Sequence, residues 1–135
     1  MSVRPTNIEI VFADWLDAQR RGDVEAMAAR LAPDVVHQGV RDELVCRNRD
    51  QVLANVRGRG GRVPPVEALE LLAAGDYVVM SIRAPGIGVP AVDGDEPRGQ
   101  ATIVFTLRDG LIVHMQDYLH RADALEAVGA AGAWD

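Results

Sequence analysis

The sequence predicts an α+β domain in which helices pack on one face of a curved antiparallel sheet. Apolar residues recur at helical spacing in the first part of the chain, whereas apolar and polar residues alternate in several later segments. The sequence Arg108-Asp109-Gly110 separates two alternating segments, and Asp-Gly at such a point is a strong β-hairpin signal. Helices followed by a run of strands are typical of the α+β class.

A helical hairpin should open the fold. The first helix is expected at about 7–21, where a capping box that starts at Thr6 precedes an apolar stripe. The stripe consists of Ile8, Val11, Phe12, Trp15 and Leu16. Gly22 can end this helix in a left-handed conformation, and Asp23 can cap a second helix that Pro33 stops.

The later helices and strands are predicted from the alternation of apolar and polar residues and from the segments that interrupt it. They are a strand at 34–40, a helix at 49–57, strands at 66–75 and 76–84, hairpin strands at 100–107 and 111–119, and a helix at 121–128. The segment 66–75 is ambiguous, because its alanine, leucine and glutamate favour a helix. We predict a strand there from its length and its position before another strand. Segments 57–65 and 85–99, rich in glycine and proline, are expected to be loops, and the first could form the lip of a pocket.

Length and composition predict one domain over 1–135, with an ordered core at about 7–128. The chain is 48% apolar and 25% charged, as in soluble globular proteins, and no segment approaches the roughly 20 apolar residues that cross a bilayer. The N-terminal segment lacks the apolar core of a signal peptide, so we expect a cytoplasmic protein without a membrane partner. The lone cysteine, Cys46, excludes an internal disulfide and favours a reducing compartment.

Several functional classes are excluded or disfavoured. The net charge of −6 argues against a nucleic-acid partner. All 14 basic residues are arginine, so no Schiff-base lysine or phosphate-loop lysine exists, and the only serines, Ser2 and Ser81, lie outside any G-x-S-x-G motif. We expect no cofactor. We also expect no metal site, because Asp117 points away from His114 across a strand, and His120 lies where a strand meets a helix.

Asp117 is the residue that most requires an explanation. In the expected strand IVHMQDYLH it shares a face with Val113, Met115 and Leu119. A carboxylate among apolar neighbours is costly unless it is paired or hydrogen-bonded. Asp117 should therefore lie near an open edge or belong to a site.

Three segments together resemble a known family. They are FADWLDAQRRGDVEAMAARLAPDVVHQGV, an R-x-R-D-Q-V helix start, and a final hairpin that ends in I-V-H-M-Q-D-Y. Over about 8–128 the chain resembles the nuclear transport factor 2-like superfamily, especially its SnoaL-like branch. The resemblance implies a cystatin-like, cone-shaped α+β barrel, a curved sheet wrapped around three helices with a pocket inside. The superfamily includes ketosteroid isomerases, limonene epoxide hydrolases, polyketide cyclases, dehydratases and binding proteins, so the fold does not settle the function.

The resemblance argues against ketosteroid isomerase activity. The position of the general-base aspartate falls on Gly39, that of the aspartate that donates to the oxyanion on about Ile103, and that of the first-helix tyrosine on about Trp15. The Asp-Arg-Asp triad of limonene epoxide hydrolases is incomplete as well. Asp117 matches its final aspartate, whereas the other two positions fall on about Ser81 and Arg83.

If the resemblance holds, seven residues line the inner surface of the cone: Trp15, His37, Ser81, Arg83, Phe105, Met115 and Asp117. Most of this lining is apolar or aromatic, counting the His37 ring, with a few convergent polar groups, which is typical of a small-molecule pocket. We expect Trp15, Ser81, Phe105 and Met115 to contact substrate. Asp117, His37 and Arg83 are the candidate catalytic residues.

The partner of Asp117 would decide the chemistry. If the partner is His37, the histidine beside the carboxylate could act as a general base near neutral pH. If the partner is Arg83, it would hold Asp117 ionised and make Asp117 a poor general acid. Two functions remain open: an isomerase, cyclase, dehydratase or hydrolase that acts on a small apolar carbonyl, hydroxyl or epoxide compound, and a non-catalytic binding or assembly domain. In the second, Asp117 and Arg83 form a structural ion pair, and His37, Trp15 and Cys46 only pack.

The outer sheet face predicts a homodimer. It should carry Ile112, Gln116, Tyr118, Thr102, Val104 and Thr106, which together are too apolar to face water if nothing covers them. Members of the resembled superfamily commonly dimerise through this face.

Overall fold

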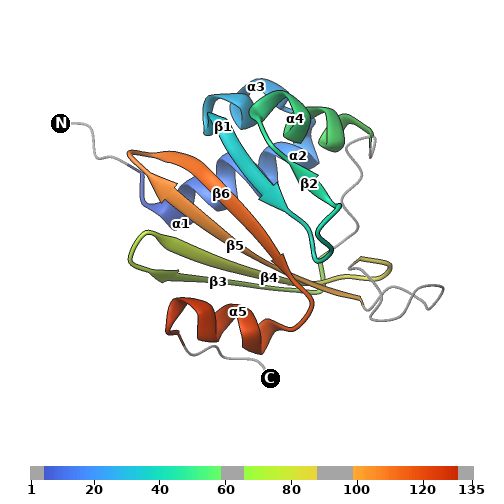
Figure 1. The fold of residues 1–135 in the computed structure, drawn as a ribbon, viewed down its shortest axis with the longest axis vertical. Helices are drawn as coiled ribbons and strands as arrows, with labels where there is room; N and C mark the ends of the chain where they lie inside the picture. The colour runs from blue at the N-terminus through green and yellow to red at the C-terminus, as the bar shows by residue number, and fades with distance from the viewer. Residues whose placement is uncertain (1–4, 59–65, 88–98, 131–135) are drawn as a thin grey trace.

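A single open sheet organises the fold (Figure 1). The computed structural model describes residues 5–58, 66–87 and 99–130, and the elements have the following bounds. The helices are α1 (Asn7–Glu9), η1 (Ile10–Asp17), α2 (Ala18–Arg21), α3 (Val24–Ala29), α4 (Arg49–Gly58) and α5 (Arg121–Val128). The strands are β1 (Leu31–Gln38), β2 (Val45–Cys46), β3 (Ala68–Ala74), β4 (Tyr77–Arg83), β5 (Gln100–Arg108) and β6 (Leu111–Tyr118). The predicted α+β class is confirmed, and most of the two expected loops lies outside the described residues.

The strand order is β2-β1-β6-β5-β4-β3. Four of the five neighbouring pairs are antiparallel, as predicted, whereas β1 and β6 are parallel. Because β1 and β6 run side by side in the same direction, their carboxyl ends lie at the same end of the sheet, where both arrowheads point in Figure 1. This pairing joins residues about 80 positions apart in sequence.

The first helix is continuous over 7–21, as predicted, but its middle part, η1, is a π-helix. The Thr6 hydroxyl accepts a hydrogen bond from the Glu9 amide at 3.1 Å, and Gly22 ends the helix at φ 68°. Hydrogen bonds in a π-helix span five residues, so its apolar side chains leave the 3.6-residue stripe. Trp15 is buried, whereas Phe12, expected to face inward, is 41% exposed.

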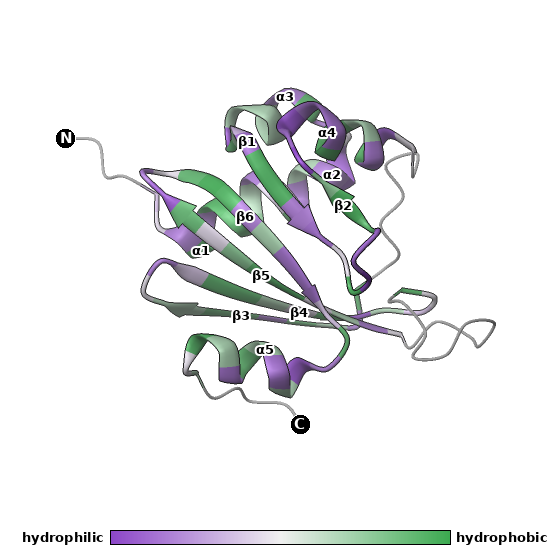
Figure 2. Cartoon of the chain, in the orientation of Figure 1, coloured by the Kyte–Doolittle hydropathy of each residue, from purple (hydrophilic) through white to green (hydrophobic). Residues whose placement is uncertain are grey.

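Helices cover both faces of the sheet (Figures 1 and 2). The first four helical segments and α4 pack on the inner face, defined here as the face that carries Val78, Met80, Phe105 and Met115, and these residues belong to the main core cluster. On the outer face, Val79 and Val104 form a second cluster with Ala124 and Leu125 of α5. A strand that is buried on both faces carries apolar residues at successive positions. Alternation of apolar and polar residues in the sequence then no longer distinguishes its two faces.

One residue expected on the outer face, Ile112, lies on the inner face instead. A register shift between Thr106 and Leu107 places Ile112 opposite Leu107, and both are buried in the inner core. Thr102 and Val104 do lie on the outer face, but each is at most 5% exposed there. On β5 the expected outer surface is therefore buried at Thr102 and at Val104, which packs against α5, whereas Thr106 is only partly buried.

Candidate active site

His37 and Asp117 form a hydrogen-bonded pair on the inner face. In the parallel β1–β6 register His37 lies beside Met115, so Asp117 is the next residue along β6 that points to the same face. His37 Nε2 is 2.7 Å from Asp117 Oδ1. The His37 side chain is 11% exposed and that of Asp117 is 31% exposed, so the pair is sheltered but reachable from solvent.

The chemistry of this pair depends on which ring nitrogen of His37 contacts the Asp117 carboxylate. An ionised carboxylate only accepts hydrogen bonds, so Nε2 must carry the proton in the pair. In a neutral imidazole Nδ1 is then the basic nitrogen. Within the part of the chain that the structure describes, Nδ1 makes no hydrogen bond. The arrangement is that of a general base oriented by a carboxylate, with the two ring nitrogens exchanged relative to the serine-protease triad.

Two cross-strand rows place apolar side chains around the pair. Cys46 on β2 pairs with His37, and Phe105 on β5 pairs with Met115, in one row. Ile103 on β5 pairs with Asp117 in the next row. Cys46 and Ile103 are only partly buried against the core. The polar pair therefore lies among inner-face side chains that are only partly buried.

Gly39, at the end of β1, supports the argument against ketosteroid isomerase activity. A Cβ atom built on Gly39 would lie 2.7 Å from Leu44 Cβ, and the Gly39 amide donates to the Leu44 carbonyl at 2.6 Å. The side-chain amide of Gln38 holds the same turn through the carbonyl oxygens of Gly39 and Arg41. Leu44 thus occupies the space that a side chain at position 39 would need.

Ser81 and Arg83 do not share a face with Asp117, which corrects the expectation. Ser81 pairs with Thr102, which pairs with Tyr118, on the outer face. The Ser81 and Thr102 hydroxyl groups are 3.4 Å apart and buried. Arg83 follows Ser81 by two residues and is also on the outer side. The expectation rested on the resembled triad positions, and because β4 is buried on both faces its apolar pattern could not show which face is the inner one.

The three expected apolar contacts lie on the inner face but inside the core. Phe105 and Met115 are 0% exposed, and Trp15 is 2% exposed. The rings of Trp15 and Phe105 meet edge to face with centroids 6.1 Å apart. Packing accounts for all three positions, and their role as substrate contacts stays a prediction.

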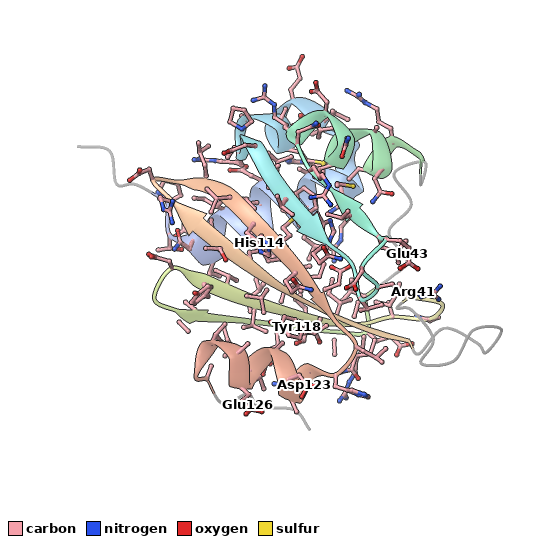
Figure 3. The ribbon with its side chains drawn as sticks, viewed as in Figure 1. Arg41, Glu43, His114, Tyr118, Asp123 and Glu126 are labelled. Atoms are coloured by element: carbon pink, nitrogen blue, oxygen red, sulfur yellow. The ribbon has the colours of Figure 1, made fainter. Side chains whose placement is uncertain are left out.

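Two neighbours of the pair were not identified from the sequence. Cys46 of β2 pairs with His37, and Leu44, the residue before β2, packs against Gly39. With only two residues, β2 is too short to produce a pattern of alternation. His114 lies on the other face of β6 (Figure 3), where it pairs with Val36 and Thr106. Burial, and then the charge of His37, lower the pKa of His114.

Searches of the described residues for two other kinds of site gave no candidate. Within 5–58, 66–87 and 99–130, no three histidine, cysteine, aspartate or glutamate side chains are arranged to hold a metal ion. Across the same described ranges, no helix has the length and apolar character that a membrane span requires.

Comparison with known families agrees with this fold. The SnoaL-like domain profile matches residues 12–115, which is more than half of the chain. The chain belongs to the SnoaL-like domain family. The matched region contains His37, Cys46 and Phe105 and ends at Met115, two residues before Asp117. No curated protein matches the sequence of this chain.

Solved structures share the fold at low sequence identity. An NTF2-like protein of unknown function from Cytophaga hutchinsonii is 13% identical over 93% of this chain and 99% of its own, with a TM-score of 0.63. A candidate polyketide cyclase from Pseudomonas putida is 18% identical over 93% and 99%, also with a TM-score of 0.63. A de novo designed protein with a curved β-sheet is 16% identical over 93% and 98%, with a TM-score of 0.62. At these identities the likeness concerns the fold alone.

Proposed function

We propose that this SnoaL-like protein is a cofactor-independent acid/base enzyme that acts on a small, largely apolar compound. The observation that carries the proposal is the 2.7 Å contact between His37 Nε2 and Asp117 Oδ1 on the inner face. His37 would act as general base through Nδ1. Asp117 would orient the ring and stabilise the imidazolium that forms.

The reaction class follows from having one positioned base. His37 can remove a proton from carbon next to a carbonyl group, from a hydroxyl group or from water, and can return it from the imidazolium to another atom of the same substrate. Proton transfer of this kind serves isomerisation, cyclisation and dehydration. Hydrolysis of an epoxide by a triad receives less support, because Ser81 and Arg83 lie on the outer face.

The surroundings of the pair favour an apolar substrate with one polar group. Cys46 and Ile103 border the pair, and Leu69 and Ile87 are also partly buried against the same core. Apolar walls with a few polar groups suit small-molecule recognition.

The test is turnover of a panel of small carbonyl, hydroxyl and epoxide compounds by wild type and variants. General acid/base catalysis typically contributes about 10²–10⁴-fold in rate, so His37→Gln and Asp117→Asn should each lower kcat by that order. His114→Gln is the matched control, since it removes a histidine from the opposite face of the same sheet. Full activity in both His37→Gln and Asp117→Asn would exclude the catalytic proposal.

The alternative function is non-catalytic ligand binding or assembly. It is favoured by the burial of Trp15, Phe105 and Met115, which leaves these side chains little surface to offer a substrate. We also propose a homodimer through the outer face of the sheet, where Gln116 and Tyr118 of β6 and Thr106 of β5 are only partly buried. Light scattering at micromolar concentration should give twice the mass of one chain, and the mass of a single chain would refute the dimer.

A further inference from the structure

Two glutamines flank the His37–Asp117 pair on the opposite face of the sheet. Gln38 follows His37 in β1, and Gln116 precedes the aspartate in β6. Successive side chains of a strand point to opposite faces, so both glutamines lie on the outer side. Gln38 and Gln116 are Cα partners, and theirs is the last pair in the parallel β1–β6 register. The polar pair and the two glutamines therefore occupy the same end of the same two strands.

The Gln38 amide group holds the turn that joins β1 to β2. Its Nε2 atom lies 3.2, 2.9 and 3.3 Å from the backbone carbonyl oxygens of Gly39, Arg41 and Leu44, respectively. All three partners are acceptors, so the side chain presents its N–H groups here rather than its oxygen. The Gly39 amide closes the turn by donating to the Leu44 carbonyl. One side-chain amide thus ties three points of the turn together.

This turn decides how the end of β1 is held on the side away from β6. β2 has only two residues and forms an edge of the sheet. Its register pairs with β1 are His37 with Cys46 and Gln38 with Val45. Because a two-stranded hairpin is marginally stable by itself, a pairing this short depends on its turn. The backbone of His37 is therefore supported by the turn that Gln38 organises.

Gln116 restrains the other strand of the pair. Its Nε2 donates to the backbone carbonyl of Asp117 at 3.2 Å. Asp117 is the penultimate residue of β6, and its register with β5 places it opposite Ile103. The register with β1 ends one residue earlier, at Gln116. Since the ends of elements open most readily, the Gln116 amide restrains the segment of β6 that presents the carboxylate.

We propose that Gln38 and Gln116 are positioning residues for the His37–Asp117 pair. Neither glutamine faces the pair, because both lie on the other side of the sheet. Gln38 acts through the turn and β2, and Gln116 acts through the backbone of Asp117. The inference rests on the pair that carries the proposed function, and it requires an N–H donor at both glutamine positions.

The substitution that isolates the donor is glutamine to glutamate, which keeps the shape but removes the N–H groups at pH 7, where glutamate is ionised. In Gln38→Glu a carboxylate would face three carbonyl oxygens, and in Gln116→Glu it would face one. The measurement is the rate at which the His37 Nε2–H proton exchanges with water, by NMR of isotope-labelled protein. Loss of one hydrogen bond of ordinary strength should accelerate this exchange at least about threefold in each variant.

Two variants control for charge and for stability. Gln51→Glu adds the same charge at α4, but Gln51 accepts from the Arg47 amide through Oε1 at 2.7 Å, which a carboxylate can also do. Asp23→Ala removes one side chain–backbone hydrogen bond, to the Ala26 amide, at the start of α3. Both variants should keep the exchange rate of the His37 proton within about twofold of wild type. The signal itself is assigned by its loss in His37→Gln.

The inference fails if either Gln38→Glu or Gln116→Glu exchanges this proton no faster than Gln51→Glu, or if wild type gives no protected signal. Equal acceleration in Asp23→Ala would also overturn it, because the effect would then follow stability alone. Circular dichroism establishes that each variant is folded. If a glutamate variant does not fold, methionine at the same position removes the donor without adding charge. Failure of the proposed function appears instead as unchanged turnover in His37→Gln, so the two failures are distinguishable.

Discussion

Removal of Arg121 should destabilise the protein far more than removal of a surface arginine. Arg121 of α5 donates through Nε at 3.1 Å to Glu70 Oε1 on β3, and a second guanidinium nitrogen contacts the same oxygen. The Arg121 side chain is 3% exposed and that of Glu70 is 9% exposed. In Arg121→Met the Glu70 carboxylate would remain buried without this partner.

The magnitude follows from that burial. Breaking a buried ion pair by removing one partner costs about 3–5 kcal/mol, whereas exposed pairs contribute about 0.2–1 kcal/mol. The matched surface pair is Arg21 with Asp17, at 3.4 Å and with side chains 48% and 38% exposed. We therefore expect Arg121→Met to lower the free energy of unfolding by about 3 kcal/mol or more, and Arg21→Met by about 1 kcal/mol or less.

Urea unfolding followed by circular dichroism measures both values. Arg121 and Glu70 also make further interactions, so the double variant Glu70→Leu with Arg121→Met is needed to isolate the pair. Because an apolar pair can replace a buried ion pair at little cost, the double variant should recover most of the loss. Equal losses for Arg121→Met and Arg21→Met would refute the reasoning, and so would a double variant less stable than either single one.

Three further predictions concern the core, the turn beside the site and pH. Phe105→Ala should cost about 3–5 kcal/mol in urea unfolding, and a loss below about 1 kcal/mol would mean that the ring lines a void rather than the core. Gly39→Ala should lower the urea midpoint because its Cβ would meet Leu44, and the loss should shrink in a Leu44→Gly background; an equal loss in both would exclude the clash. Burial, and then His37, lower the pKa of His114, so the unfolded chain binds the proton more readily and stability should fall as pH drops below about 6.5. His114→Gln should flatten this fall, and an unchanged pH profile would contradict it.

The sequence predicted the positions of the helices and strands better than it predicted the sheet face on which each side chain lies. Local signals sufficed for the first helix, where Thr6 and Gly22 set the ends, and for the β5–β6 hairpin at Asp109-Gly110. The strand at 66–75, predicted against its helix propensity, is confirmed as β3. Propensity is a weak signal that pairing with a neighbouring strand can override.

The errors arose where long-range packing decides the outcome. The parallel β1–β6 pairing depends on residues far apart in sequence, and no local pattern specifies it. Ser81 and Arg83 were placed on the inner face by the resemblance alone, and β4 is buried on both faces, so its sequence pattern offered no check on that placement. Ile112 changed face through a register shift, which strict alternation does not anticipate. The position of Asp117 relative to His37 could be anticipated only through family resemblance.

The position of the polar pair accounts for the acid/base chemistry that we propose for a chain without the isomerase base. At Gly39 a carboxylate has no room, because Leu44 packs against the bare backbone. Two residues earlier on the same face, His37 reaches the neighbouring strand and meets Asp117. A base at this position depends on the parallel β1–β6 register, since a shift of one residue would send either side chain to the other face. The base is thus shared between two strands that only the complete sheet brings together, so any variant that loosens β1 from β6 should impair the site before it unfolds the core.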